Sequence, residues 1–166
     1  GGCGAPRGKR PGMTPFDLSL YLVLDPGLCA GIGMVETARR AVMGGATMVQ
    51  LRDKQAGTAG LIATGRALKA ALAGSGARLI VNDDAEAAVA IGADGLHVGQ
   101  GDLSVREARS RIGAGMILGL SVETPELAAS ADPLLVDYIG AGPVFATPTK
   151  PDHKRPVGFD GLAVQV

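Results

Sequence analysis

Short apolar runs alternate with longer alanine-rich stretches along the chain from Ser19 onward. The apolar runs are rich in Val, Ile and Leu, which predicts β-strands, and the alanine-rich stretches have the length of helices. The predicted strands are residues 19–25, 47–53, 77–83, 94–99, 116–122 and 136–140. The predicted helices are residues 33–43, 58–73, 84–91, 104–112 and 124–130, and a sixth begins near Gly158. This alternation indicates βα units around a parallel sheet.

The residues at the predicted helix ends agree with this pattern. Three of the helices are followed by glycines, where a left-handed cap is easiest for glycine: Gly44 and Gly45, Gly74 and Gly76, and Gly113 and Gly115. Thr58, Ser104 and Thr124 stand at positions typical of N-caps. We therefore expect one α/β domain over residues 13–166.

Polar residues collect just after the carboxyl ends of the predicted strands. In parallel barrels and doubly wound sheets the βα loops converge at that edge, so it is the expected ligand face. The residues concerned are Arg52, Lys54, Asn82, Asp83, Asp102, Ser121 and the segment 147–150. The chemistry of this chain is therefore predicted to lie on one face of the fold.

Composition limits the classes of partner. Sixteen basic and sixteen acidic residues give a net charge of zero, so no overall field favours nucleic acid or an anionic membrane. No apolar stretch is long enough to span a bilayer. The two cysteines, Cys3 and Cys29, have no metal-binding spacing, which is typical of a reducing cytoplasm. Residues 1–12 lack periodicity and are expected to be a disordered leader, native or left over from expression.

The segment 50–54 combines a hydrogen-bonding amide with two cations. Gln50 and Arg52 are two residues apart in a strand, so their side chains point the same way, and Lys54 follows in the loop. This pattern favours an anionic ligand that also forms hydrogen bonds, such as a diphosphate on a heterocycle. The alternative is a strand end at which a salt bridge to Asp53 neutralises the cations.

Two carboxylates follow adjacent predicted strands, Asp83 in the pair Asn82–Asp83 and Asp102 in the next loop. They suit Mg²⁺, which takes one or two protein carboxylates and completes its octahedron with water and phosphate oxygens. The alternative reading, an acid at a helix N-terminus, is preferred for Asp84.

Three further polar features are the segment 147–150 and the two histidines. Thr147, Pro148, Thr149 and Lys150 follow the sixth predicted strand and could donate several hydrogen bonds to a phosphate, although a generic polar loop looks similar. His97 could reach the site or be a structural histidine, and His153 lies in a basic loop. Neither histidine has the neighbours of a catalytic triad or a zinc site.

Five motifs in order carry a family resemblance: QLRDK (50–54), VND (81–83), DGLHVGQGD (94–102), GLSVET (119–124) and YIGAGPVFATPTK (138–150). Together they resemble the thiamine-phosphate synthase family over about residues 19–165. The resemblance implies a TIM-type (β/α)8 barrel. It also implies an enzyme that joins 4-amino-2-methyl-5-hydroxymethylpyrimidine diphosphate to a thiazole phosphate, giving thiamine monophosphate and pyrophosphate through a pyrimidine carbocation.

The resemblance also assigns roles to particular residues. It implies that Asp83 and Asp102 hold Mg²⁺ and that Arg52, Ser121 and Lys150 are catalytic. The residues implied to bind substrate are Gln50, Leu51, Arg52, Asp53, Lys54, Asn82, Ser121, Thr147, Pro148, Thr149 and Lys150.

An eight-stranded barrel needs about 200 residues or more, and this sequence carries about six βα units. Strands seven and eight are therefore expected to be missing, which would leave the first and sixth strands as apolar edges that favour association, including homo-oligomers. The alternatives are a thiazole tautomerase, a sugar-phosphate isomerase or epimerase on the same fold, and a truncated non-catalytic paralogue that binds phosphate ligands.

Overall fold

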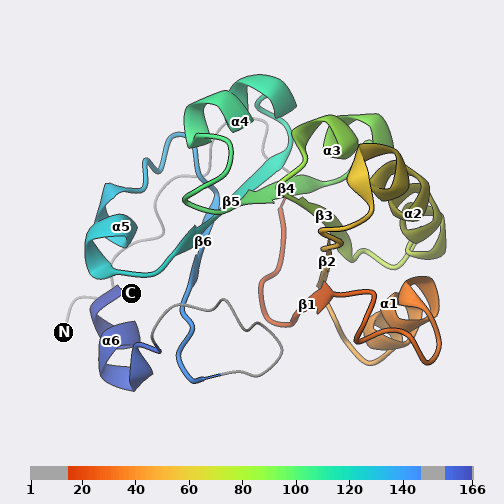
Figure 1. The fold of residues 1–166 in the computed structure, drawn as a ribbon, viewed down its shortest axis with the longest axis horizontal. Helices are drawn as coiled ribbons and strands as arrows, with labels where there is room; N and C mark the ends of the chain where they lie inside the picture. Colours follow the sequence, from red (N-terminus) through yellow and green to blue (C-terminus); the bar gives the residue numbers. More distant parts are fainter. Residues whose placement is uncertain (1–14, 147–155, 166) are drawn as a thin grey trace.

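Six parallel strands form one curved sheet in the computed structural model, which describes residues 15–146 and 156–165 (Figure 1). The strands are β1 (Tyr21–Leu24), β2 (Met48–Leu51), β3 (Arg78–Asn82), β4 (Gly95–Val98), β5 (Ile117–Val122) and β6 (Tyr138–Ala141). Their order in the sheet is their order in the sequence, and every neighbouring pair is parallel. The prediction of βα units around a parallel sheet is confirmed.

A helix follows each strand. The helices are α1 (Met34–Met43), α2 (Gly57–Ala71), α3 (Ala85–Ile91), α4 (Val105–Ile112), α5 (Pro125–Ser130) and α6 (Gly158–Gln165). Helices α1 to α5 lie around the outer side of the curved sheet (Figure 1). The described residues therefore form a half-barrel with its helices outside.

The strand pleat separates two cores. Outward-facing residues such as Leu51, Val81 and Leu96 have no exposed surface and pack in the core shared with the helices. Inward-facing residues from alternate strand positions form a second cluster, which contains Met48, Ile80, Ile117 and Tyr138 with Phe16 and Tyr21 packed against it. Because side chains alternate between faces, each strand contributes both to the outer core and to the barrel interior.

Two of the three predicted N-caps are confirmed. The Ser104 hydroxyl accepts a hydrogen bond from Glu107 N at 3.3 Å, and the Thr124 hydroxyl accepts one from Leu127 N at 3.2 Å. Thr58 is not an N-cap, because α2 begins one residue earlier and Thr58 Oγ1 instead donates to Asp84 Oδ2 at 2.7 Å.

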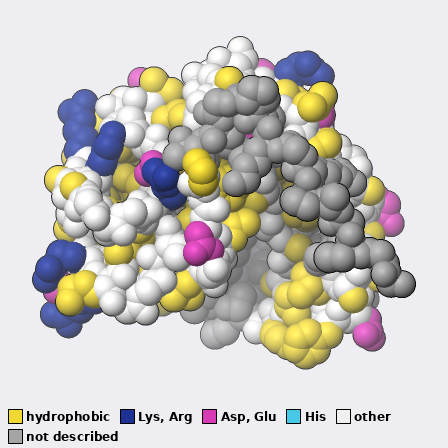
Figure 2. All heavy atoms as spheres, turned by 180° about the vertical axis from the view of Figure 1, so that it is seen from behind, with side chains coloured by type: hydrophobic (Ala, Val, Ile, Leu, Met, Phe, Trp, Pro, Cys, Tyr) yellow, Lys and Arg dark blue, Asp and Glu magenta, His cyan; other side chains and the backbone are white. Residues whose placement is uncertain are grey.

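The two edges of the sheet are β1 and β6. Among the described residues, β1 pairs with β2 alone and β6 pairs with β5 alone. Large apolar side chains are exposed near both edges, including Val23 (47% exposed) in β1 and Phe159 (72%) in α6. Figure 2 shows hydrophobic side chains gathered over α6, at the lower right of that view.

In the described ranges, no helix has both the length and the hydropathy needed to cross a bilayer.

Candidate active site at the carboxyl ends of the strands

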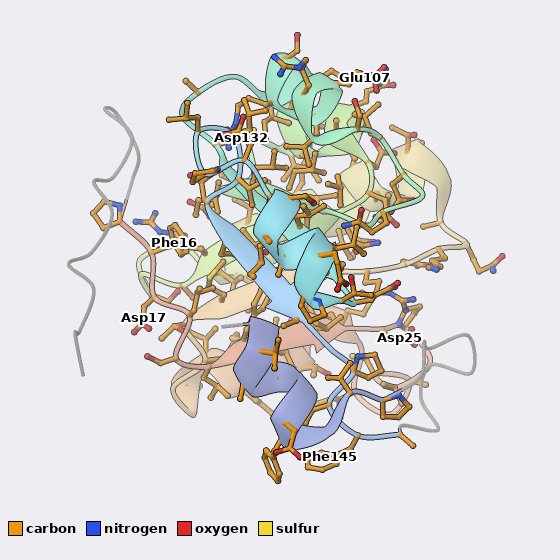
Figure 3. The ribbon with its side chains drawn as sticks, turned by 90° about the vertical axis from the view of Figure 1, so that its left-hand side faces the viewer. Phe16, Asp17, Asp25, Glu107, Asp132 and Phe145 are labelled. Atoms are coloured by element: carbon orange, nitrogen blue, oxygen red, sulfur yellow. The ribbon has the colours of Figure 1, made fainter. Side chains whose placement is uncertain are left out.

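Two cavities lie where the strands end, and the Asn82 side chain borders both. The first is about 620 Å³ in volume, and the predicted site residues in its wall are Gln50, Arg52 and Ser121. The second, also about 620 Å³, is bordered by Asp53, Lys54, Asp83 and Asp102. Figure 3 shows Asp25, which borders the first cavity, at the end of the sheet opposite Phe16. The structure thus divides the predicted polar residues between two adjoining spaces.

Gln50 and Arg52 point into the same cavity, as their spacing predicts. The partner of Arg52 is an acid that its sequence neighbourhood does not indicate. Arg52 Nη1 lies 3.5 Å from Asp25 Oδ2 at the end of β1, and its side chain is 19% exposed. Asp53, the expected salt-bridge partner, instead accepts a hydrogen bond from Gln55 N at 3.0 Å. For Arg52 the salt-bridge alternative therefore named the wrong acid.

Asp83 lies in a strained position at the end of β3. Its φ of 63° is in the left-handed region, which aspartate enters more readily than most residues. Its backbone N–H donates to His97 O at 2.8 Å, and its carboxylate accepts from Asn82 Nδ2 at 2.6 Å. The conformation thus turns the Asp83 carboxylate away from the strand, into the second cavity.

The carboxyl groups of Asp83 and Asp102 face each other. Burial, together with hydrogen bonding and repulsion from Asp102, raises the pKa of Asp83 from 3.8 to about 6, while Asn82 and Lys54 act in the opposite direction. Asp102 is exposed and also accepts a hydrogen bond from Gly99 N at 2.8 Å. The described residues contain no group of three or more His, Cys, Asp or Glu side chains suited to a metal. A divalent cation here would have two protein carboxylates.

Four polar residues of this region were not predicted as site residues. Tyr21 and Tyr138 border the first cavity, and their hydroxyl oxygens are hydrogen-bonded at 2.7 Å. Asp25 forms an ion pair with Arg52. Gln100 Nε2 donates to the backbone oxygen of Ser121 at 2.7 Å. Strand alternation could have placed both tyrosines on the inner face, but no sequence signal indicates that β1 and β6 contact each other.

The remaining residues that the sequence singles out fall into four groups. His97 borders the first cavity and is 8% exposed. The Leu51 side chain lies in the outer core, away from both cavities. Asp84 accepts a hydrogen bond from Ala87 N at 2.8 Å as the N-cap of α3, which confirms the reading preferred for it. Thr147, Pro148, Thr149, Lys150 and His153 lie outside the described residues.

The chain matches known proteins over most of its length. The family profile described as thiamine monophosphate synthase matches residues 20–165. A thiamine-phosphate synthase of Xanthobacter autotrophicus is 51% identical over 144 residues, which cover 87% of this chain and 68% of the relative. A thiamine-phosphate synthase of Psychrobacter sp. is 48% identical over 149 residues, covering 88% and 70%.

A solved structure agrees with the sequence matches. The thiamine phosphate pyrophosphorylase of Pyrococcus furiosus has a TM-score of 0.78 and 34% sequence identity to this chain, and the match covers 90% of this chain and 69% of that protein. The half-barrel of this chain therefore has the same fold as the matched 69% of the Pyrococcus furiosus protein. The chain belongs to the thiamine-phosphate synthase family.

Proposed function

We propose that this chain condenses 4-amino-2-methyl-5-hydroxymethylpyrimidine diphosphate with a thiazole phosphate, giving thiamine monophosphate and pyrophosphate. The observation that carries the proposal is the pair of adjoining cavities. One has an apolar and hydrogen-bonding wall that suits a heterocycle, and the other has the charged groups that suit a diphosphate with a cation. Asn82 stands between them, where the link from ring to diphosphate would pass.

The charges support this orientation of the substrate. Arg52 borders the first cavity, largely buried and held by Asp25, so its guanidinium is positioned before a ligand arrives. Lys54 borders the second cavity and is close enough to act on the pKa of Asp83. Two cations on either side of Asn82 would attract and orient the anionic end of the pyrimidine substrate.

Asp83 and Asp102 fit the requirements of Mg²⁺. Two carboxylates that repel each other in one partly buried space are stabilised by a divalent cation, and hard oxygen ligands are those that Mg²⁺ prefers. When bound, the cation would neutralise part of the charge on the leaving diphosphate. Because a full protein cage is absent from the described residues, substrate oxygens and water would supply the other ligands.

The residues support a dissociative reaction. The bond between the pyrimidine methylene carbon and the diphosphate oxygen breaks, and its electron pair leaves with pyrophosphate. The resulting carbocation is stabilised by the aminopyrimidine ring, and the thiazole nitrogen donates its lone pair to form the new C–N bond. Arg52 and Lys54 stabilise the departing anion, while the barrel interior holds the ring and limits the access of water. This path needs no side-chain nucleophile.

Several finer assignments belong to the same proposal. The half-barrel would be part of an eight-stranded barrel, since β1 and β6 each have an edge without a described partner strand. Thr147, Pro148 and Thr149 would bind the thiazole phosphate, and Lys150 would reach the leaving diphosphate. A cytoplasmic location is supported by the cysteine content, and the exposed apolar side chains near both edges support self-association.

The test is an assay of pyrophosphate release with both substrates and Mg²⁺, on protein whose intact mass has been measured, with the product identified by mass spectrometry. Asp102→Asn should lower kcat about 100-fold, because it removes a cation ligand that acts on the leaving group. Asp132→Asn is the matched control, since Asp132 lies in the α5–β6 loop and its carboxylate accepts from Leu134 N at 2.8 Å. Equal activity of the two variants would contradict the proposal.

The alternatives give different results in the same assay. A thiazole tautomerase would convert its substrate without the pyrimidine diphosphate and would tolerate Asp102→Asn. A non-catalytic paralogue would bind the pyrimidine diphosphate in a Mg²⁺-dependent way and release no pyrophosphate.

A further inference from the structure

Five side chains form a continuous line of hydrogen bonds across the half-barrel interior, here called the interior relay. Gln50 Nε2 donates to the Tyr21 hydroxyl at 2.9 Å, and the Tyr21 and Tyr138 hydroxyls are 2.7 Å apart. The Tyr138 hydroxyl is 3.0 Å from His97 Nδ1, and His97 Nε2 is 2.8 Å from Ser121 Oγ. The relay thus connects two predicted substrate-binding residues through three residues that have no assigned role.

The packing is built around this line. The Tyr21 and Tyr138 rings meet edge to face with centroids 5.8 Å apart, although β1 and β6 are opposite edges of the sheet. Strand β5 lies between β4 and β6, and its Gly119 is opposite both His97 and Tyr138. A Cβ at Gly119 would overlap the Tyr138 ring and hydroxyl and lie 2.5 Å from His97 Nδ1. Only glycine leaves room for the tyrosine and histidine to meet.

Three of the five relay residues are buried, and Tyr21 and Ser121 are half-buried. Gln50 is 5% exposed, and His97 and Tyr138 are each 8% exposed. Burial raises the pKa of both tyrosines, so each phenol keeps its proton and has one hydrogen to donate. A buried line of such groups is stable only when donors and acceptors alternate consistently along it.

We propose that the relay has a fixed direction, from Gln50 to Ser121, and that Tyr21, Tyr138 and His97 are positioning residues for the pyrimidine substrate. Tyr21 accepts from the Gln50 amide, and in the proposed direction it gives its own hydrogen to Tyr138. Tyr138 then gives its hydrogen to His97 Nδ1. As a neutral imidazole that accepts at Nδ1, His97 then carries its proton on Nε2 and donates to Ser121 Oγ.

This direction has a chemical consequence for Ser121. A hydroxyl that accepts from His97 has its own hydrogen left to donate, and Ser121 borders the first cavity. Ser121 is then a donor toward a ring nitrogen of the heterocycle. It is not a nucleophile activated by His97, because His97 Nε2 is already protonated and cannot act as the base. The inference rests on the proposed function only for the identity of the ligand.

The first experiment reads the tautomer directly and needs no substrate. The protein is labelled with 15N-histidine in a His153→Gln background, so that His97 is the single histidine observed by NMR. We expect a protonated Nε2 and an unprotonated Nδ1, and we expect Tyr138→Phe to remove this preference. A proton on Nδ1 in the parent protein, which a reversed Gln50 amide would produce, would overturn the proposed direction.

The second experiment measures KM and kcat for each substrate. His97→Gln can keep a donor near the position of Nε2, whereas His97→Asn cannot. We expect His97→Asn and Tyr138→Phe to raise KM for the pyrimidine diphosphate about tenfold or more, with KM for the thiazole phosphate unchanged, and His97→Gln to recover most of the loss.

Phe16→Leu is the control for loss of packing. Phe16 lies against Tyr138 with ring centroids 6.0 Å apart and donates no hydrogen bond to the relay, so this variant should lower stability without changing either KM. If the relay variants change stability alone, like Phe16→Leu, the positioning role is wrong. If the parent protein binds and turns over neither substrate, the proposed function fails, whereas the NMR result still decides the direction of the relay.

Discussion

The raised pKa of Asp83 makes a quantitative prediction about stability. Below pH 3.8 the carboxyl group is protonated in both the folded and the unfolded chain, so it has no effect on the free energy of unfolding. As the pH rises, the unfolded chain ionises first, and the folded protein loses stability until the pH exceeds about 6. Asp83 therefore destabilises the cation-free protein at neutral pH.

The size of this effect follows from the shift. A rise in the pKa of Asp83 from 3.8 to about 6 would lower the free energy of unfolding by about 3 kcal/mol at neutral pH, if solvent screening is ignored. Because Asp83 is only half-buried, solvent screens part of its interactions, and we reduce the expected effect on the free energy of unfolding to about 1–1.5 kcal/mol. Asp83→Asn should recover that amount, because asparagine keeps an acceptor for Asn82, tolerates the left-handed backbone and cannot ionise.

The assay is urea unfolding in EDTA at pH 7.5 and at pH 4.5. The dependence of stability on proton binding predicts that Asp83→Asn raises the free energy of unfolding at pH 4.5 by about a third of its increase at pH 7.5. Asp84→Asn is the matched control, since asparagine caps a helix equally well and its amide can donate to the Thr58 hydroxyl that now donates to Asp84. Added Mg²⁺ should stabilise the parent protein and not Asp83→Asn. A gain of equal size at both pH values, or a loss at pH 7.5, would refute the electrostatic reasoning.

Two further predictions concern stability away from the site, each measured by urea unfolding. Arg109 donates to Asp137 Oδ2 at 2.8 Å and to several backbone carbonyls, and the Asp137 side chain is 2% exposed. Arg109→Met should therefore lower the free energy of unfolding by about 3–5 kcal/mol, because it leaves the buried Asp137 carboxylate without this partner. Arg106→Met is the control at an exposed arginine and should lower it by less than about 0.5 kcal/mol, so similar losses in the two variants would contradict the reasoning. Ser104→Ala removes one half of the capping box of α4 and should cost about 0.5–2 kcal/mol, whereas Ser110→Ala on the same helix should have little effect. Equal losses at the two serines would show that the cap is not what stabilises α4.

Much of the fold was predictable because its signals are local. Strand alternation and alanine-rich helices indicate βα units within windows of a few residues, and the parallel sheet then places every strand end at one edge. The two-residue spacing of Gln50 and Arg52 is enough to bring them to one face, and the order of the strands is enough to place Asp83 near Asp102. The roles of these residues stay predictions, as do those of Thr147 to Lys150.

Only the tertiary structure decided which side chains meet across the barrel. Arg52 pairs with Asp25 on the neighbouring strand, where the sequence suggested Asp53. Tyr21 and Tyr138 are 117 residues apart, yet their hydroxyls form one hydrogen bond in the interior. The sequence determined the strands, the helices and the face on which polar groups end. The curvature of the sheet decided which side chains of its two edge strands meet, because curvature depends on the packing of all six strands and has no local signal.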